Sequence, residues 1–111
     1  MGGIIEKPWG REEVLYEEDG LKVKRLTVFA GKRTSLQFHE YRSEFMVCIG
    51  GHGHVLIGDT VYDTTSIQID AKEVHRIIAD EEQDFTLIEV QRGMICDDND
   101  IIRIADDFNR K

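Results

Sequence analysis

A ten-residue stretch, residues 35–44 (S-L-Q-F-H-E-Y-R-S-E), brings together an amide, an imidazole, a guanidinium and two carboxylates. In an extended strand alternate residues share a face, so Gln37 and His39 point away from the side occupied by Leu36 and Phe38. If the next strand returns antiparallel after a short turn, Glu44 comes back close to His39. Nitrogen and oxygen donors of this kind suit a divalent metal ion.

Two later segments offer further polar groups for the same site. His75 begins a predicted strand, and Glu89 and Gln91 share one face of the apolar segment 85–91 (F-T-L-I-E-V-Q). Burying a carboxylate and an amide is costly unless each has a partner, and a barrel interior lined by a metal or a sugar would supply one. The residues alone are equally compatible with His39 and His75 as ordinary strand residues with ordinary hydrogen bonds.

Short segments rich in β-forming residues, separated by turn signals, run along the chain. About eight such segments and a single proline predict an all-β sandwich or barrel. The expected strands are 21–30, 35–39, 44–49, 54–57, 60–62, 66–69, 74–79 and 85–91. The tail, 98–108, is compatible with a short helix or with a last strand preceded by a turn.

The length and composition limit the function classes. A chain of 111 residues predicts one domain, and the net charge of −8 argues against nucleic-acid binding. Acidic clusters at 12–13, 17–19, 80–84 and 97–98 are interpreted as exposed, solubilising groups. No segment resembles a signal peptide or a membrane span, so we expect a cytoplasmic protein that does not bind membranes.

The spacing around His39 resembles the first motif of the cupin superfamily. Gly31 is followed after five residues by Gln37-Phe38-His39, after four more by Glu44, and after six more by Gly51. Gln37 stands where the general motif has its first histidine. His75, within E-V-H-R-I, resembles the single histidine of the second cupin motif.

Five segments in matching order resemble the type II phosphomannose isomerase domain. They are 7–10 (K-P-W-G), 31–44, 74–77 (V-H-R-I), 88–93 (I-E-V-Q-R-G) and 100–110 (D-I-I-R-I-A-D-D-F-N-R). The resemblance implies that residues 1–111 form a single cupin domain, a double-stranded β-helix or jelly-roll barrel. The chain departs from the family pattern at Phe45, where a histidine is usual, and at Met46, where a tryptophan is usual.

The resemblance implies a metal-dependent sugar-phosphate isomerase that interconverts mannose 6-phosphate and fructose 6-phosphate. The alternatives are an isomerase or epimerase of another sugar phosphate, and a non-catalytic sugar-binding or regulatory cupin. The implied ligands of a divalent metal ion are Gln37, His39, Glu44 and His75. Zinc is the first candidate for that ion, with manganese, cobalt, nickel or iron as alternatives. The expected partners are a small-molecule sugar phosphate and a second copy of the chain in a homodimer.

Further roles follow from the same resemblance. Glu89 is the candidate catalytic base, because burial should raise its pKa; the alternative is a carboxylate that orients Arg76 or a metal ligand. Arg42 is expected beside the metal, in contact with the substrate or the transition state. The expected substrate-binding residues are Lys7, Arg33, Arg76, Gln91 and Arg103. Each cation taken alone is better explained as a solvated surface charge, and only the placement of Lys7 and Arg103 in family-like motifs favours a role in binding.

His52 and His54 form a tempting His-x-His pair. They follow the Gly50-Gly51 turn and lie outside the ligand positions of the cupin motif. We therefore expect them to be solvent-facing or edge-strand histidines, with no role in the interior metal site.

Overall fold

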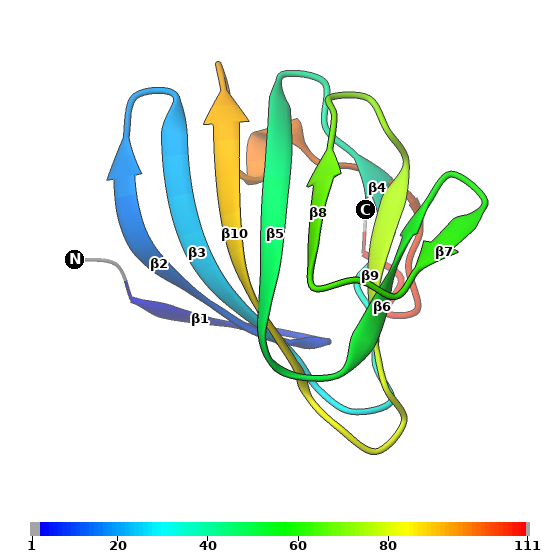
Figure 1. The fold of residues 1–111 in the computed structure, drawn as a ribbon. Helices are drawn as coiled ribbons and strands as arrows, with labels where there is room; N and C mark the ends of the chain where they lie inside the picture. The colour runs from blue at the N-terminus through cyan, green and yellow to red at the C-terminus, as the bar shows by residue number, and fades with distance from the viewer. Residues whose placement is uncertain (1–2, 111) are drawn as a thin grey trace.

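The computed structural model describes residues 3–110 and contains two β-sheets that face each other (Figure 1). The larger sheet has the strand order β1-β2-β3-β10-β5-β8. Its strands are β1 (Ile4–Lys7), β2 (Gly10–Glu18), β3 (Leu21–Val28), β5 (Arg42–Gly51), β8 (Ser66–Ile69) and β10 (Phe85–Gly93).

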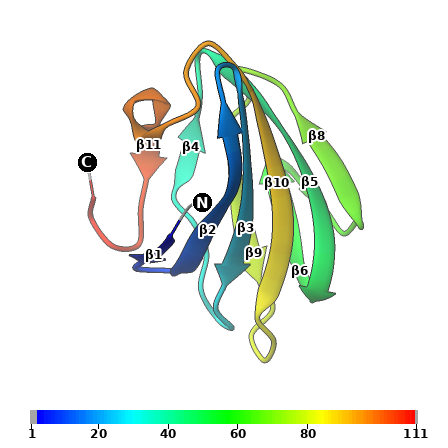
Figure 2. The ribbon, with the colours of Figure 1, turned by 90° about the vertical axis from the view of Figure 1, so that its left-hand side faces the viewer.

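The smaller sheet has the order β11-β4-β9-β6-β7. Its strands are β4 (Leu36–Phe38), β6 (Gly53–Ile57), β7 (Thr60–Tyr62), β9 (His75–Ala79) and β11 (Ile102–Ala105). Neighbouring strands pair antiparallel, and the last strand, β11, runs along β4 (Figure 2). The chain therefore forms the predicted all-β jelly-roll barrel.

All eight strands expected from the sequence are present. The structure adds β1, β2 and β11, and it resolves the ambiguous tail as a 3-10 turn (Asp98–Asp100) that leads into β11. β2 was missed because its segment, G-R-E-E-V-L-Y-E-E, is dominated by charged residues. Its pairing with β1 on one side and β3 on the other supplies the backbone hydrogen bonds that its composition does not signal.

Glu12 corrects the interpretation of the acidic clusters as exposed groups. Its side chain is buried and accepts a hydrogen bond from Lys24 Nζ at 2.8 Å. The neighbouring Glu13 pairs with Arg25 on the other face of the strand, where it remains partly exposed. The two-residue alternation of β2 thus sends one carboxylate of the cluster inward.

The inward face of each central strand changes from apolar to polar along its length. On β10, Phe85 and Leu87 are buried at one end, and Glu89 and Gln91 are buried at the other, while Ile88 is only half-buried. This confirms the predicted face of β10. The apolar core consists of Trp9, Leu26, Val28, Met46, Val55, Ile69, Ile77, Ala79, Phe85 and Leu87.

The described residues contain no helix that is long and apolar enough to span a membrane.

Within the barrel interior, the apolar core lies at one end and the buried polar side chains lie at the other. The site described below is built from that polar end.

Candidate metal and ligand site

Three of the predicted metal ligands converge in the barrel interior. Glu44 Oε2 lies 3.4 Å from His39 Nε2, and Glu44 Oε1 lies 3.3 Å from His75 Nε2. All three side chains are at most 2% exposed. They come from different places in the fold: His39 follows β4, Glu44 lies on β5, and His75 begins β9. This group of two imidazoles and a carboxylate could hold a metal ion.

Backbone carbonyls fix the orientation of both histidines. His39 Nδ1 lies 2.8 Å from the carbonyl oxygen of Asp100, and His75 Nδ1 lies 2.9 Å from that of Glu73. Because a carbonyl oxygen only accepts, each Nδ1 carries a hydrogen, and in the neutral ring Nε2 then keeps its lone pair. Both lone pairs face Glu44, which is the arrangement that metal-binding histidines adopt.

Two buried atoms of this group have no hydrogen-bond partner. Glu44 Oε1 and His75 Nε2 are close to each other, but neither makes a hydrogen bond of suitable geometry among the described residues. Leaving a buried carboxylate oxygen unsatisfied costs roughly 1–3 kcal/mol or more. A divalent cation bound between these atoms would satisfy both, so the residues present fit a metal ion. Such an ion would act as a Lewis acid toward an oxygen atom of a bound ligand.

Gln37 lies beside the three converging residues. It is paired with His75 in the sheet, its Nε2 is 3.5 Å from His39 Nε2, and its Oε1 accepts a hydrogen bond from Ser35 Oγ at 2.6 Å. Binding a metal through Oε1 requires the side-chain amide to turn over. The role of Gln37 as a ligand therefore stays a prediction.

Asp100 and Arg42 hold the loop that carries His39. The carboxylate of Asp100 accepts hydrogen bonds from the backbone nitrogens of Glu40 and Tyr41, both at 2.9 Å. Arg42 lies where the sequence predicted, with Nη2 3.1 Å from Glu44 Oε2 and Nη1 donating to the carbonyl oxygen of Asp97. The importance of Asp100 was not foreseen, because its partners lie about sixty residues earlier in the chain.

Glu89 and Gln91 extend the polar cluster along β10. Gln91 Nε2 donates to Glu89 Oε1 at 2.6 Å and to Glu44 Oε2 at 3.4 Å. Burial raises the pKa of Glu89 to about 7, and the charge of Glu44 contributes to the rise. Burial also acts to raise the pKa of Glu44, but the neighbouring imidazoles of His39 and His75 hold it well below its ordinary value. One carboxyl group is thus ionised while the other can accept or donate a proton near neutral pH.

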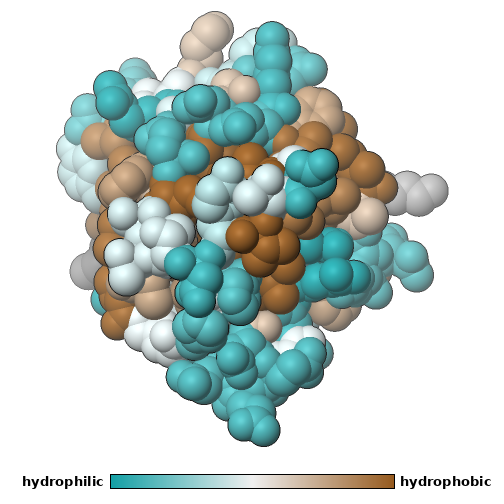
Figure 3. Space-filling view, turned by 45° about the vertical axis from the view of Figure 1, so that its right-hand side comes forward, coloured by the Kyte–Doolittle hydropathy of each residue, from teal (hydrophilic) through white to brown (hydrophobic). Residues whose placement is uncertain are grey.

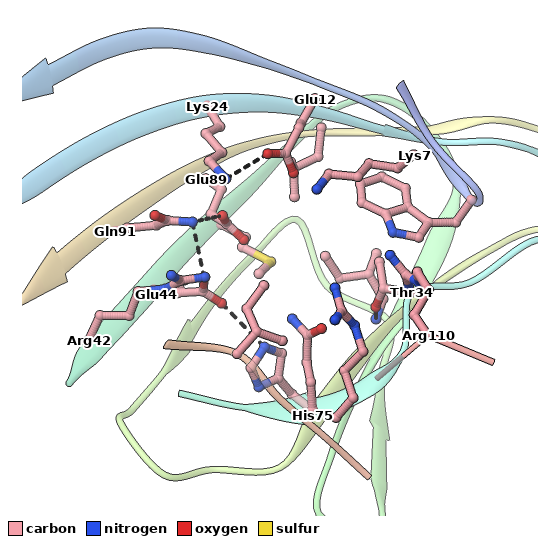
Figure 4. A pocket seen from close by; sticks show the side chains of 17 residues that line it. Lys7, Glu12, Lys24, Thr34, Arg42, Glu44, His75, Glu89, Gln91 and Arg110 are labelled. Atoms are coloured by element: carbon pink, nitrogen blue, oxygen red, sulfur yellow. Dashed lines mark hydrogen bonds and ion pairs between the residues drawn. The ribbon is translucent and has the colours of Figure 1, made fainter. Parts of the chain in front are cut away.

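The buried polar side chains line a pocket in the barrel interior, and this pocket has two chemically different ends (Figure 4). Glu44, Arg42 and Gln91 lie at one end, and Lys7 and Arg110 lie at the other. Among the lining residues that the structure describes, the cationic ones are Lys7, Lys24, Arg42, Arg103 and Arg110, and the carboxylates are Glu12, Glu44 and Glu89. The lining therefore has an excess of cationic groups, although the chain carries a net charge of −8.

Two of the predicted substrate-binding residues lie elsewhere. Arg33 is exposed and forms a two-pronged ion pair with Asp107, at 2.8 and 3.0 Å. Arg76 alternates with His75 on β9, so it points to the opposite face and donates to the carbonyl oxygen of Thr34. This corrects the expected position of both arginines, and it also separates Arg76 from Glu89. Lys7, Gln91 and Arg103 line the pocket as expected.

Lys24, Glu12 and Thr34 line the pocket and were not predicted. Lys24 alternates with apolar residues in L-K-V-K-R-L-T-V, where a charged residue is usually taken to face solvent. The alternation does indicate the inward position of Lys24, because Lys22, Lys24 and the core residue Leu26 share one strand face.

The two departures from the family pattern fall on opposite faces of β5. Phe45 is 40% exposed on the outside of the barrel, whereas Met46 is buried and lines the pocket. Only the change at Met46 therefore affects the interior. The interior remains lined by the converging metal-ligand candidates despite this substitution.

Relatives of known name cover nearly the whole chain. It is 36% identical to a mannose-1-phosphate guanylyltransferase of Sinorhizobium fredii, over 91% of this chain and 20% of the relative. It is 32% identical to the xanthan biosynthesis protein XanB of Xanthomonas campestris, over 96% of this chain and 23% of the relative. The chain thus spans about a fifth of the length of these relatives.

Solved structures with little sequence identity share the fold. A cupin-2 domain from Rhodospirillum rubrum aligns with a TM-score of 0.73 at 14% identity, over 89% of this chain and 78% of the other. An oxalate decarboxylase from Bacillus subtilis aligns with a TM-score of 0.78 at 18% identity, over 93% of this chain and 30% of the other. At such low identity these likenesses concern the fold alone.

The names of the relatives correct the expectation of an isomerase. The motifs in this chain identify a domain, and that domain is about a fifth of proteins named for guanylyl transfer or for polysaccharide biosynthesis. One fold can serve many reactions, so motifs that identify the domain do not identify the reaction. Interconversion of mannose 6-phosphate and fructose 6-phosphate is therefore not assigned to this chain. The coarser expectation holds, in that the domain occurs in enzymes.

The family described as "Mannose-6-phosphate isomerase C-terminal" matches residues 3–106. The match includes the whole of both sheets, the converging residues His39, Glu44 and His75, and the polar end of β10. Together with the cupin fold of the barrel, this establishes that the chain belongs to the Mannose-6-phosphate isomerase C-terminal family.

Proposed function

We propose that this chain is a divalent-metal-binding domain that binds a mannose phosphate inside its barrel and serves a mannose-1-phosphate guanylyltransferase reaction. The observation that carries the proposal is the buried group of His39, Glu44 and His75, with two unsatisfied atoms facing each other. The relatives named for mannose-1-phosphate guanylyltransferase support the choice of sugar phosphate.

The ligand chemistry supports a borderline divalent cation. Imidazole nitrogen and carboxylate oxygen donors suit zinc, and they also suit manganese, cobalt, nickel and iron. We propose that His39, Glu44 and His75 are the protein ligands and that Gln37 completes the set. Zinc is our first candidate for the resident ion.

The charge distribution in the pocket supports an anionic ligand. Lys7 and Arg110 lie at the end opposite Glu44 (Figure 4), and Arg103 lies next to Gln37 in the sheet. A phosphate group bound among these cations would leave the sugar hydroxyls toward the metal group and Glu89. Charge-assisted hydrogen bonds from lysine and arginine are the usual means of holding a phosphate.

Binding measurements test the proposal. The chain is stripped with a chelator, loaded with zinc, and titrated calorimetrically with mannose 1-phosphate, mannose 6-phosphate, mannose and inorganic phosphate. At least one mannose phosphate should bind more tightly than either fragment. Absence of binding by both mannose phosphates to the zinc-loaded chain would overturn the proposed ligand.

Two variants separate the metal from the phosphate contacts. Glu44→Gln keeps the shape but removes the charge, and it should lower interior zinc affinity by more than about 100-fold, since losing an outer partner of a ligand costs 10–100-fold. Arg103→Ala should weaken mannose phosphate binding by about 10–100-fold with zinc still bound. Arg25→Ala is the matched control, because Arg25 is exposed and pairs with Glu13 outside the pocket.

The homodimer and the cytoplasmic location stay predictions. The outer face of the larger sheet carries exposed Phe45 and Ile49, which is compatible with pairing of two chains. Light scattering on the purified chain would measure its oligomeric state.

A further inference from the structure

A second group of potential metal ligands lies outside the barrel. His52 precedes β6, His54 lies on it, and Asp63 follows β7. His52 Nε2 is 3.2 Å from Asp63 Oδ1, and His54 Nε2 is 4.0 Å from Asp63 Oδ2. One ligand atom from each residue lies within 4.8 Å of the other two. The two imidazole rings meet edge-on, with centroids 5.1 Å apart.

This group is separate from the interior site. His54 pairs with Ile78 on β9, three residues along the strand from His75, which corresponds to about 10 Å. The side chain of His54 also points outward, because its strand neighbours Gly53 and Val55 are buried. On this side of the molecule, hydrophilic side chains fill the lower surface and mix with apolar ones above (Figure 3). His52 and His54 are partly exposed, with 42% and 37% of their side-chain surfaces accessible.

The backbone that carries His52 packs so closely against neighbouring segments that the residues on both sides must be glycines. Gly51 has a φ of +70°, and a Cβ there would lie 1.6 Å from the carbonyl oxygen of Asp84. A Cβ on Gly53 would lie 2.3 Å from the ring of Phe85. The carbonyl oxygen of His52 also accepts a hydrogen bond from the backbone nitrogen of Asp80 at 3.0 Å. The position of His52 is therefore set by packing against the core and by β9, and it is not that of a loose loop.

Asp80 orients the ring of His52. Asp80 Oδ2 lies 3.2 Å from His52 Nδ1, and Asp80 Oδ1 accepts a hydrogen bond from the backbone nitrogen of Glu82 at 2.9 Å. The carboxylate is thus anchored and accepts the hydrogen on Nδ1, which leaves Nε2 directed at Asp63. A carboxylate behind an imidazole is the arrangement that supports histidines bound to zinc, because it fixes the tautomer and makes the other nitrogen a better donor.

We propose that His52, His54 and Asp63 form a second, surface metal site for a zinc-class divalent cation, with Asp80 supporting His52. In a tetrahedral zinc site the donor atoms are separated by roughly 3.3 Å. The 3.2 and 4.0 Å separations observed here need only small side-chain adjustments to reach that geometry. Three protein ligands leave a fourth position for water, as expected at an exposed site.

The competing account is an ion-pair cluster without a metal. Hydrogen bonds to Asp80 and then Asp63 raise the pKa of His52, so a protonated ring would also be stabilised between the two carboxylates. That account leaves His54 without a function, since His54 only reaches Asp63 at the limit of an ion pair. The metal site uses both rings and gives the two imidazoles and the two carboxylates a common function.

Zinc titration of the chelator-stripped full chain tests the proposal. Uptake is measured by calorimetry, and the imidazole nitrogens are followed by ¹⁵N-edited NMR. The wild type should bind one more zinc ion than the double variant His54→Gln/Asp63→Asn, and the Nε2 signals of His52 and His54 should shift with that ion. Asp59→Asn, an exposed carboxylate change in the turn of the same hairpin, is the control and should match the wild type.

The outcome is separable from that for the interior site. If the wild type and the double variant bind the same number of zinc ions, or if the signals of His52 and His54 do not move, the surface site is overturned. If only His52 and His54 respond, the surface site stands and the interior metal proposal fails. Circular dichroism of the double variant should match the wild type, because both substituted side chains lie on the surface.

Discussion

The two ends of the barrel interior are built by the same strands with the same alternation, but with opposite chemistry. At one end, Leu87 on β10 faces Leu26 on β3, and both side chains are at most 4% exposed. Two residues further along β10, Glu89 faces Lys24, and both are again at most 4% exposed. Burial is therefore nearly identical at the two ends, and only the side-chain types differ.

This difference separates the source of stability from the source of function. The apolar end contributes hydrophobic burial without further requirements. The polar end is tolerated only because its groups satisfy one another, as Gln91 does for Glu89 and Glu44. Glu44 Oε1 and His75 Nε2, which like Gln91 Oε1 have no hydrogen-bond partner, lie close together and mark the place where a cation would fit. Substitutions at the two ends should therefore have different consequences.

The largest expected effect on stability comes from the apolar end. Leu87→Ala should lower the free energy of unfolding by about 2–5 kcal/mol, because it leaves a cavity in the core. Urea denaturation measures this loss. Zinc affinity of the folded variant should stay at the wild-type value, and a parallel loss of zinc affinity would show that the two ends are not independent.

A pH-dependent effect is expected from the polar end. The pKa of Glu89 is raised from 4.5 to about 7 by burial, so folding favours its protonated form. The stabilisation from that form is complete below the unfolded value and is lost as the pH rises through about 7. Glu89→Gln does not titrate at this position. The unfolding free energy of the chelator-stripped wild type, relative to this variant, should therefore fall by about 3 kcal/mol between about pH 4 and pH 8.

Urea denaturation at a series of pH values measures this difference. A constant difference between the wild type and Glu89→Gln across that range would mean that Glu89 is ionised at its ordinary pKa. The polar end would then be more hydrated than its burial indicates.

The smallest effect is expected on the outer face of β5. Phe45→His restores the residue usual in similar domains, but Phe45 points away from the pocket and is 40% exposed. The change should alter the free energy of unfolding by less than about 0.5 kcal/mol. Zinc and mannose phosphate affinities should not change in calorimetric titrations. A clear gain in either affinity would show that a substitution on the outer face alters binding in the interior.

The sequence was sufficient for the strands, because they depend on local spacing, whereas the metal-ligand candidates came from the resemblance to the cupin motifs. The alternation of Gln37 and His39 placed them on one face, and the apolar strand around Glu89 showed that this carboxylate is buried. The same alternation could have revealed Lys24, which was not considered, and Glu12, whose charge was instead interpreted as solvent-exposed. Charged residues at inward positions are informative because they violate the usual pattern.

The missed features depend on contacts between distant parts of the chain. Arg33 was expected to bind substrate, but its partner Asp107 lies in the C-terminal tail, and sequence spacing carries no information about that pairing. The support that Asp100 gives to the loop after His39 is of the same kind. The His52 and His54 pair was set aside because it lies outside the ligand positions of the cupin motif, and sequence spacing does not indicate its partners Asp63 and Asp80, which come from two other loops.

The central claim is that the polar end of the barrel holds a divalent cation between His39, Glu44 and His75. Anomalous diffraction at the zinc absorption edge, on crystals of the zinc-loaded chain, tests it directly because it locates each bound ion. The account predicts a peak with His39 Nε2, His75 Nε2 and a Glu44 oxygen about 2.0–2.2 Å away. Zinc-loaded crystals in which these three side chains are well ordered and no anomalous peak lies between them would contradict it.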